Sequence, residues 1–224
     1  MIKDRRIALA LRLVFLITAV SGFLSMMGLF FTGGFRGGTL AYYTMQSNIL
    51  AIVLFIMLTV RTAIGLREGK TGKTGYFARF EMVCTVDIML TFIVFWVLLA
   101  PTVFTMVDDY PMWSFENLAV HAITPLLCLL DYILFSEPRH LKYRDVYFVC
   151  IFPFAYLVGT SLAGLMGYVY MISPTDGLPV RFPYFFYDFD RIGAASLIYV
   201  AVLIVFLLMI GHVFYLIDRK RSLR

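Results

Sequence analysis

Charged residues are scarce in this sequence. Only 15% of its 224 residues are Asp, Glu, Lys or Arg, whereas 61% are hydrophobic. A soluble globular domain usually has about a quarter of its residues charged. The mean hydropathy of +0.86 points the same way. The composition therefore excludes an ordinary soluble domain and predicts an integral membrane protein.

Cysteine and histidine, which supply most metal ligands and catalytic thiols, are also rare. The three cysteines, Cys84, Cys128 and Cys150, lie in apolar runs and lack the CxxC spacing of disulfide or zinc sites. Signatures of phosphate-binding loops, HExxH zinc sites and dinucleotide folds are missing. We therefore expect no metal and no cofactor. Nucleic-acid binding is not expected either, because the basic residues lie in short connections between apolar runs.

Six apolar runs are long enough to cross a bilayer, for which about 20 residues are needed. They cover about residues 8–32, 43–65, 80–104, 116–136, 146–171 and 193–217. In lipid each run must satisfy its own backbone hydrogen bonds, so each is predicted to be a helix. The first run exceeds the ~7–15 residues of a signal-peptide core, so we expect it to be retained. The predicted fold is all-α, a single six-helix transmembrane domain over residues 1–224.

The basic residues predict the orientation of these helices. If the six runs alternate across the membrane, 16 of the 19 Lys and Arg residues lie on the side of the two termini. Only Arg36, Arg181 and Arg191 lie on the other side. The positive-inside rule therefore places both termini in the cytoplasm. The longest outer loop, 172–192, is aromatic and is expected either to lie on the membrane surface or to fold over the helices as a lid.

Two helices carry polar side chains near their outer ends, each set on one helical face. The second helix has its set at spacing i, i+3 and i+4, namely Thr44, Ser47 and Asn48. The fourth helix has a set at one-turn spacing, namely Asn117, His121, Thr124 and Pro125. Because both sets lie at a similar depth, they satisfy each other if they face each other across the bundle.

These polar sets have two interpretations. One is hydrogen bonding that holds helices together, which membrane proteins use routinely. The other is catalysis, since a His beside a hydroxyl supplies the base and nucleophile of acyl transfer. Thr44 and Ser47 are both possible nucleophiles for His121. Residues that could orient His121 or stabilise an oxyanion are Gln46, Ser47, Asn48, Asn117 and Asp188.

A second polar set is expected toward the cytoplasmic end. It comprises Glu81 and Asp87 on the third helix, Asp131 on the fourth, and Arg12 and Arg61 at comparable depth. The simplest interpretation of buried Asp87 and Asp131 is structural ion pairing with arginines. The alternative is a path for protons or cations, in which intramembrane acids are expected.

Three segments carry a family resemblance. In order they are YYTMQSNIL at 42–50, NLAVHAITPLLCLLDYILF at 117–135 and FPYFFYDFDRIG at 182–193. Together they resemble the androgen-induced/androgen-dependent membrane protein family, whose animal members look like six-span hydrolases of fatty acid esters of hydroxy fatty acids. The resemblance implies a nucleophile at Thr44 and a catalytic histidine at His121. Many bacterial relatives share the pattern, so a bacterial cytoplasmic membrane is expected, with the site toward the extracytoplasmic side.

Three hypotheses follow for the function. The first is an intramembrane esterase that uses Thr44 and His121 on a membrane lipid or fatty acid ester. The second is a non-enzymatic lipid-binding or transport protein in which Asp87 and Asp131 matter most. The third is an acyltransferase; a related branch uses a cysteine, and no cysteine is expected at the outer site here.

Overall fold

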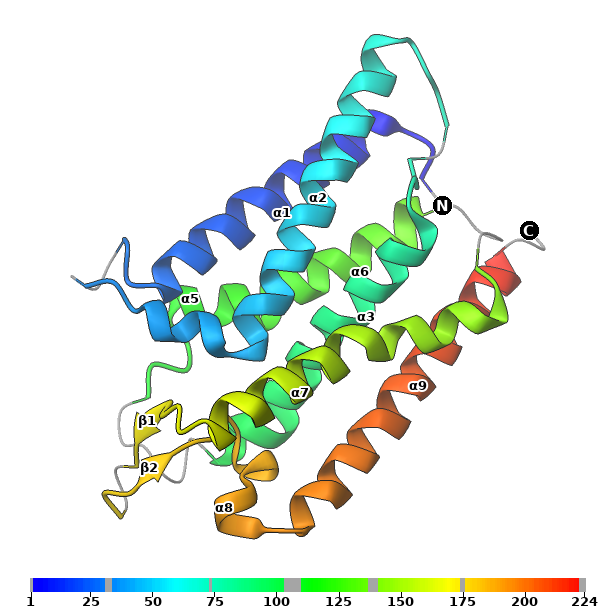
Figure 1. Cartoon of the computed structure of the whole chain (residues 1–224). Helices are drawn as coiled ribbons and strands as arrows, with labels where there is room; N and C mark the ends of the chain where they lie inside the picture. The colour runs from blue at the N-terminus through cyan, green and yellow to red at the C-terminus, as the bar shows by residue number, and fades with distance from the viewer. Residues whose placement is uncertain are drawn as a thin grey trace.

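The computed structural model of this chain describes residues 2–30, 34–72, 74–102, 110–136, 141–173 and 176–221. Three of the basic positions used to orient the helices, Lys73, Arg139 and Arg224, lie outside these ranges. Figure 1 shows the arrangement of the elements. In chain order they are α1 (Arg5–Met26), η1 (Gly37–Ala41), α2 (Tyr43–Arg67), α3 (Ala78–Val94), η2 (Phe95–Leu99), α5 (Phe115–Leu118), η3 (Ala119–Ile123), α6 (Thr124–Phe135), η4 (Tyr143–Cys150), α7 (Ile151–Leu165), β1 (Met171–Ile172), β2 (Pro179–Val180), η5 (Phe185–Tyr187), α8 (Phe189–Ile192) and α9 (Ala195–Arg221).

Six helices are long and apolar enough to span a membrane, which confirms the predicted all-α, six-span architecture. They are Arg5–Met26, Tyr43–Arg67, Ala78–Thr102, Phe115–Phe135, Tyr143–Leu165 and Ala195–Arg221. Two of them end several residues before the predicted limits of 32 and 171. The reason is local, because Gly28 and Gly167 adopt φ of 77° and 88°, a left-handed conformation that ends a helix.

The helices form two groups (Figure 1). In the first group α1 packs against α2 and α6, and α3 packs against α2 and α6. Its core includes the stacked rings of Phe15 and Phe55, whose centroids are 3.5 Å apart. In the second group α9 packs against η4 and against α3, on the side of the bundle away from α1. The α3 helix therefore joins the two groups.

Both ends of the described chain lie at the same end of the bundle. The backbone N–H of Ile2 donates to the carbonyl oxygen of Leu134 at 3.0 Å. The guanidinium of Arg221 donates to the carbonyl oxygen of Tyr132 at 3.2 Å. Because Tyr132 and Leu134 are at the C-terminal end of α6, we call this the terminal end of the bundle. The opposite end, where α2 begins, is called the far end.

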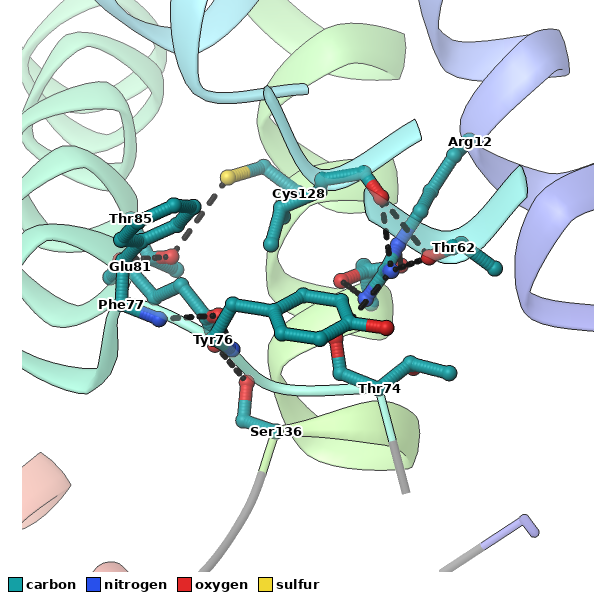
Figure 2. Close-up of polar contacts among 11 residues, drawn as sticks. Arg12, Thr62, Thr74, Tyr76, Phe77, Glu81, Thr85, Cys128 and Ser136 are labelled. Carbon is teal, nitrogen blue, oxygen red and sulfur yellow. Dashed lines mark hydrogen bonds and ion pairs between the residues drawn. The ribbon is translucent and has the colours of Figure 1, made fainter. Parts of the chain in front are cut away.

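A buried ion pair joins α1 to α6 near the terminal end. Arg12 donates Nε to Asp131 Oδ1 at 2.8 Å and Nη2 to Oδ2 at 3.0 Å. Its Nη1 donates to Thr62 Oγ1 at 2.5 Å and to the carbonyl oxygen of Thr74 at 3.3 Å (Figure 2). Such bidentate pairing, with the remaining donors satisfied, is what keeps a buried arginine tolerable.

The other two acids of the predicted inner set have no such arginine partner among the described residues. Glu81 accepts from the backbone N–H of Tyr76 at 2.9 Å and from the hydroxyl of Ser136 at 2.6 Å (Figure 2). Asp87 is fully buried and accepts from the hydroxyl of Tyr43 at 3.3 Å. Within the described ranges Asp87 is therefore bonded to a tyrosine hydroxyl and makes no ion pair with an arginine.

Candidate active site

The polar faces of the second and fourth spans meet at the far end. Thr44 lies in the first turn of α2 and His121 lies in η3, and Thr44 Oγ1 is 3.3 Å from His121 Nε2. His121 is almost fully buried, and Thr44 is half-buried. A hydroxyl within hydrogen-bonding range of an imidazole nitrogen is the basic geometry of an activated nucleophile.

The histidine ring is held in one tautomer and one plane. His121 Nδ1 is 3.1 Å from the carbonyl oxygen of Asn117. Because a carbonyl oxygen only accepts, Nδ1 carries the proton and Nε2 presents its lone pair to Thr44. The ring also stacks on Phe95, with centroids 3.7 Å apart and planes 17° apart. The Asn117 carbonyl thus orients the imidazole, the role that a carboxylate has in other triads.

His121 belongs to η3 and its ring stacks on Phe95 of η2, and both η2 and η3 are π-helical turns. A proline two residues after each turn explains why the helix widens there. Pro125 has no N–H to donate to the carbonyl of His121 four residues before it, and its ring crowds that carbonyl. The wider turn η3 relieves this crowding, and Trp96 Nε1 donates to the His121 carbonyl at 3.0 Å. Pro101 follows η2 at the same spacing. Such π-turns occur frequently at functional sites.

Two neighbours of Thr44 hold α2 in place. The amide nitrogen of Asn48 donates to the carbonyl oxygens of Thr44 at 2.8 Å and Val120 at 3.2 Å, so it joins α2 to η3. The hydroxyl of Ser47 donates to the Thr44 carbonyl at 3.0 Å and lies 2.7 Å from the hydroxyl of Thr91. Asn48 and Ser47 therefore position Thr44, and the hydroxyl that faces His121 is that of Thr44.

Tyr184, from the segment between α7 and α9, reaches the same place. Its hydroxyl oxygen accepts from the backbone N–H of Tyr43 at 3.0 Å, so it lies beside Thr44. Burial raises the pKa of Tyr184 to about 12, although the hydrogen bond from the Tyr43 backbone acts in the opposite direction. A neutral phenol therefore stands beside Thr44. Sequence reasoning missed this residue, and the only available signal was its place in the segment FPYFFYDFDRIG.

Three predicted site residues have other contacts. Gln46 donates to the carbonyl oxygen of Leu40 at 3.2 Å, on the opposite side of α2 from Asn48. The side-chain amide of Asn117 donates to the Met112 carbonyl at 2.7 Å, and only its backbone carbonyl faces His121. Asp188 caps α8 and pairs with Arg191 at 3.2 Å. Among the described residues the group that orients His121 at Nδ1 is the Asn117 carbonyl, and Asp188 lies elsewhere, at the start of α8.

A cavity of about 460 Å³ adjoins Thr44. Its walls come from α3, α7, α9 and the aromatic segment Phe182–Tyr187, and its lining is mainly apolar. Phe182, Phe186 and Tyr187 are buried against the helices, so this part of the loop 172–192 folds over them, which is one of the two predicted alternatives. The neighbouring hairpin is held by Arg191, whose hydrogen bonds lower the pKa of Asp176 below its usual range.

No cluster of three or more His, Cys, Asp or Glu side chains suited to a metal ion occurs in the part of the chain that the structure describes. Comparisons of the chain with models of protein families, with curated proteins and with solved structures find no significant match.

Proposed function

We propose that this protein is an intramembrane esterase that hydrolyses fatty acid esters of hydroxy fatty acids or similar lipid esters. The observation that carries the proposal is the Thr44–His121 pair with an oriented imidazole, in which Thr44 also lines an apolar cavity within a bundle of helices long enough to span a membrane. The resemblance of three segments to the androgen-induced/androgen-dependent family, which includes hydrolases of this kind, supports the same assignment.

The first half-reaction uses the Thr44 hydroxyl. As Thr44 Oγ1 attacks the ester carbonyl carbon, its proton passes to His121 Nε2. The tetrahedral intermediate then collapses, the bond to the alkoxide oxygen breaks, and His121 returns the proton to that oxygen. The hydroxy fatty acid leaves and an acyl-threonine remains. Water, deprotonated by the same nitrogen, hydrolyses the acyl-threonine and releases the fatty acid.

The negative charge that develops on the carbonyl oxygen needs a donor. We assign this role to the Tyr184 hydroxyl, which is neutral and adjoins Thr44. Thr44 also lies in the first turn of α2, where the helix dipole favours negative charge. A fixed hydrogen-bond donor in a site with little water stabilises the oxyanion more strongly than the same donor does in water.

The orientation belongs to this proposal as well. We place the far end, with Thr44, outside a bacterial cytoplasmic membrane. Gly38→Cys in η1 and Lys70→Cys in the connection after α2 test it, because both positions are exposed and a Cβ added at Gly38 meets no atom within 4 Å. In cells of a Cys150→Ala background, a membrane-impermeant maleimide is expected to label Gly38→Cys only. Labelling of Lys70→Cys alone would show that the protein has the opposite orientation.

Hydrolysis by purified protein in nanodiscs tests the chemistry. The substrate is a palmitate ester of a hydroxystearic acid, and the variants are Thr44→Ala and His121→Ala, with Ser47→Ala as the matched hydroxyl control. We expect at least a thousandfold loss for the first two variants and a small effect for Ser47→Ala. A hydroxylamine-sensitive acyl group on the Thr44 peptide is expected in rapidly quenched wild type. Full activity of folded Thr44→Ala would refute the assignment.

Adding a lyso-lipid to the same assay separates hydrolysis from acyl transfer. We expect free fatty acid as the main product, whereas transfer to the lyso-lipid would make the protein an acyltransferase with the same nucleophile. Asp87→Asn tests the non-enzymatic hypothesis. We expect this variant to retain hydrolysis, since Asp87 contacts Tyr43 and neither Thr44 nor His121.

A further inference from the structure

The cavity beside Thr44 has two ends at different depths. Tyr156 of α7 donates its hydroxyl to the Ala41 carbonyl at 3.0 Å, which places Tyr156 level with the start of α2. Cys150 also lines the cavity but lies six residues earlier. At the helical rise it is about 9 Å closer to the terminal end than Tyr156. The cavity therefore extends from Thr44 and Tyr184 into the depth of the membrane span.

The cavity is mainly apolar along its length. From α9 it is lined by Val200, Leu203, Ile204 and Leu207, and none of its lining side chains is charged. The hydroxyls of Thr44 and Tyr184 lie at the far end. The hydroxyls of Tyr43 and Thr91, which belong to the lining as well, are already engaged by Asp87 and Ser47. A ligand that fills this space is therefore apolar along its length and has one polar end.

One wall of the cavity reaches the surface that faces lipid. Phe154 and Ile151 of α7 line the cavity and are 61% and 59% exposed, and Ile204 of α9 is 40% exposed. The two helices are held together at η4, which packs on α9, and they diverge from there toward the far end (Figure 1). The Tyr187 hydroxyl fastens the aromatic segment to α7 by donating to the Leu157 carbonyl at 2.8 Å. The opening that remains lies between α7 and α9.

We propose that this cavity is an acyl-chain site entered sideways from the bilayer between α7 and α9. Its occupant is the single fatty acyl chain of the scissile ester, with the carbonyl carbon at Thr44 and the methyl end toward Cys150. The inference rests on the proposed function and adds the binding mode. Because lipid tails are as apolar as the cavity, chain burial itself adds little selectivity. The depth of the cavity instead sets the chain length that brings the carbonyl to Thr44.

Photoaffinity mapping tests the binding mode without any reaction. Two palmitic acid probes carry a diazirine, one beside the methyl end and one beside the carboxyl group, and each is added to the Thr44→Ala protein in nanodiscs. We expect the first probe to label peptides with Cys150 or Leu207, and the second to label the peptide with Tyr184. Excess palmitate is expected to suppress both. The same labelling pattern for both probes, or suppression by cholesterol in place of palmitate, would overturn the proposal.

Chain-length preference tests the depth. Cys150→Phe fills the deep end, and Val205→Phe, on the lipid-facing side of α9 at 59% exposure, is the matched control. For Cys150→Phe we expect at least a tenfold fall in kcat/KM for palmitoyl esters relative to octanoyl esters, and no shift for the control. An unchanged ratio in folded Cys150→Phe would overturn the proposal.

The two tests also separate the proposals. Probe labelling without any ester hydrolysis would keep the acyl-chain site and remove the esterase. Hydrolysis without labelling would keep the esterase and place the chain elsewhere.

Discussion

The indole N–H of Trp96 donates to the carbonyl oxygen of His121 at 3.0 Å. That carbonyl is available because Pro125, four residues later, has no N–H to offer it. The indole therefore replaces a missing helical hydrogen bond directly at the proposed base. It also ties η2 to η3, and the ring of Phe95 in η2 stacks on the imidazole of His121. One proline thus accounts for both the local widening of the helix and the contact that fixes it.

Pro125→Ala tests this relationship. Alanine restores the N–H, so we expect η3 to tighten into a regular α-helix and His121 to rotate away from Thr44. Hydrolysis is expected to fall roughly 100-fold, the scale on which small displacements of catalytic groups act. The unfolding free energy is expected to stay level or rise, because proline is about 3 kcal/mol less favourable than alanine inside a helix. The hydrolysis rate and the thermal unfolding of the same preparation test these two expectations.

A double-mutant cycle with Trp96→Phe supplies the control. In wild type this change removes the indole hydrogen bond to the buried His121 carbonyl, which is expected to cost about 1–3 kcal/mol. In Pro125→Ala the carbonyl has its own N–H, so the same change is expected to cost less. Equal costs in both backgrounds would show that Pro125 and Trp96 act independently.

Much of the site could be predicted from the sequence because helical periodicity determines which residues share a face. Thr44 with Asn48, and Asn117 with His121, are one turn apart, and the structure brings these two faces together. Tyr184 could not be placed in this way. It lies in a segment between helices whose path is set by packing of aromatic rings, and no periodicity reports that packing.

The second polar set, which includes Asp87 and Asp131, shows the same limit. Composition and helix assignment predict that buried acids need partners, and Arg12 does pair with Asp131. They do not predict which partner each acid finds. Asp87 bonds to the hydroxyl of Tyr43, because the rotation of α3 against α2 brings these two side chains together. The rotation of one helix against another depends on the sum of many packing contacts, so no single sequence motif predicts it.

Tyr184→Phe is expected to slow the chemical step. Loss of one oxyanion donor lowers kcat by about 10²–10³-fold with a smaller change in KM. Tyr156→Phe is the matched control, because its hydroxyl also borders the cavity but donates to the Ala41 carbonyl. Since the pKa of Tyr184 is raised to about 12, the donor stays protonated and the rate is not expected to fall as pH rises through about 10, the ordinary tyrosine value. A fall at that pH in wild type, absent in Tyr184→Phe, would contradict this.

Arg12→Met is expected to destabilise the fold without changing the chemistry. It leaves Asp131 buried without its ion-pair partner, which costs about 3–5 kcal/mol. Combining it with Asp131→Leu is expected to recover most of the loss, because neither partner then remains as an uncompensated charge. Lys70→Met, which removes an exposed pair with Glu68, is expected to cost less than about 1 kcal/mol. The free energy of unfolding in detergent is measured for the wild type, the two single variants and the double variant. A double variant no more stable than Arg12→Met would contradict the account.

Gly22→Ala is expected to disturb the site from outside it. A Cβ at Gly22 would lie 2.3 Å from the Cβ of Ala119 in η3, so α1 and η3 must move apart. Overpacking of this kind costs about 1–3 kcal/mol, and because η3 carries His121 we expect hydrolysis to fall as well. Adding Ala119→Gly removes the clash and is expected to restore activity. Gly159→Ala on α7, where an added Cβ has no atom within 4 Å, is the control and is expected to be neutral or slightly stabilising. If Ala119→Gly fails to restore the activity of Gly22→Ala, the close approach of α1 is not what sets the distance from Thr44 to His121.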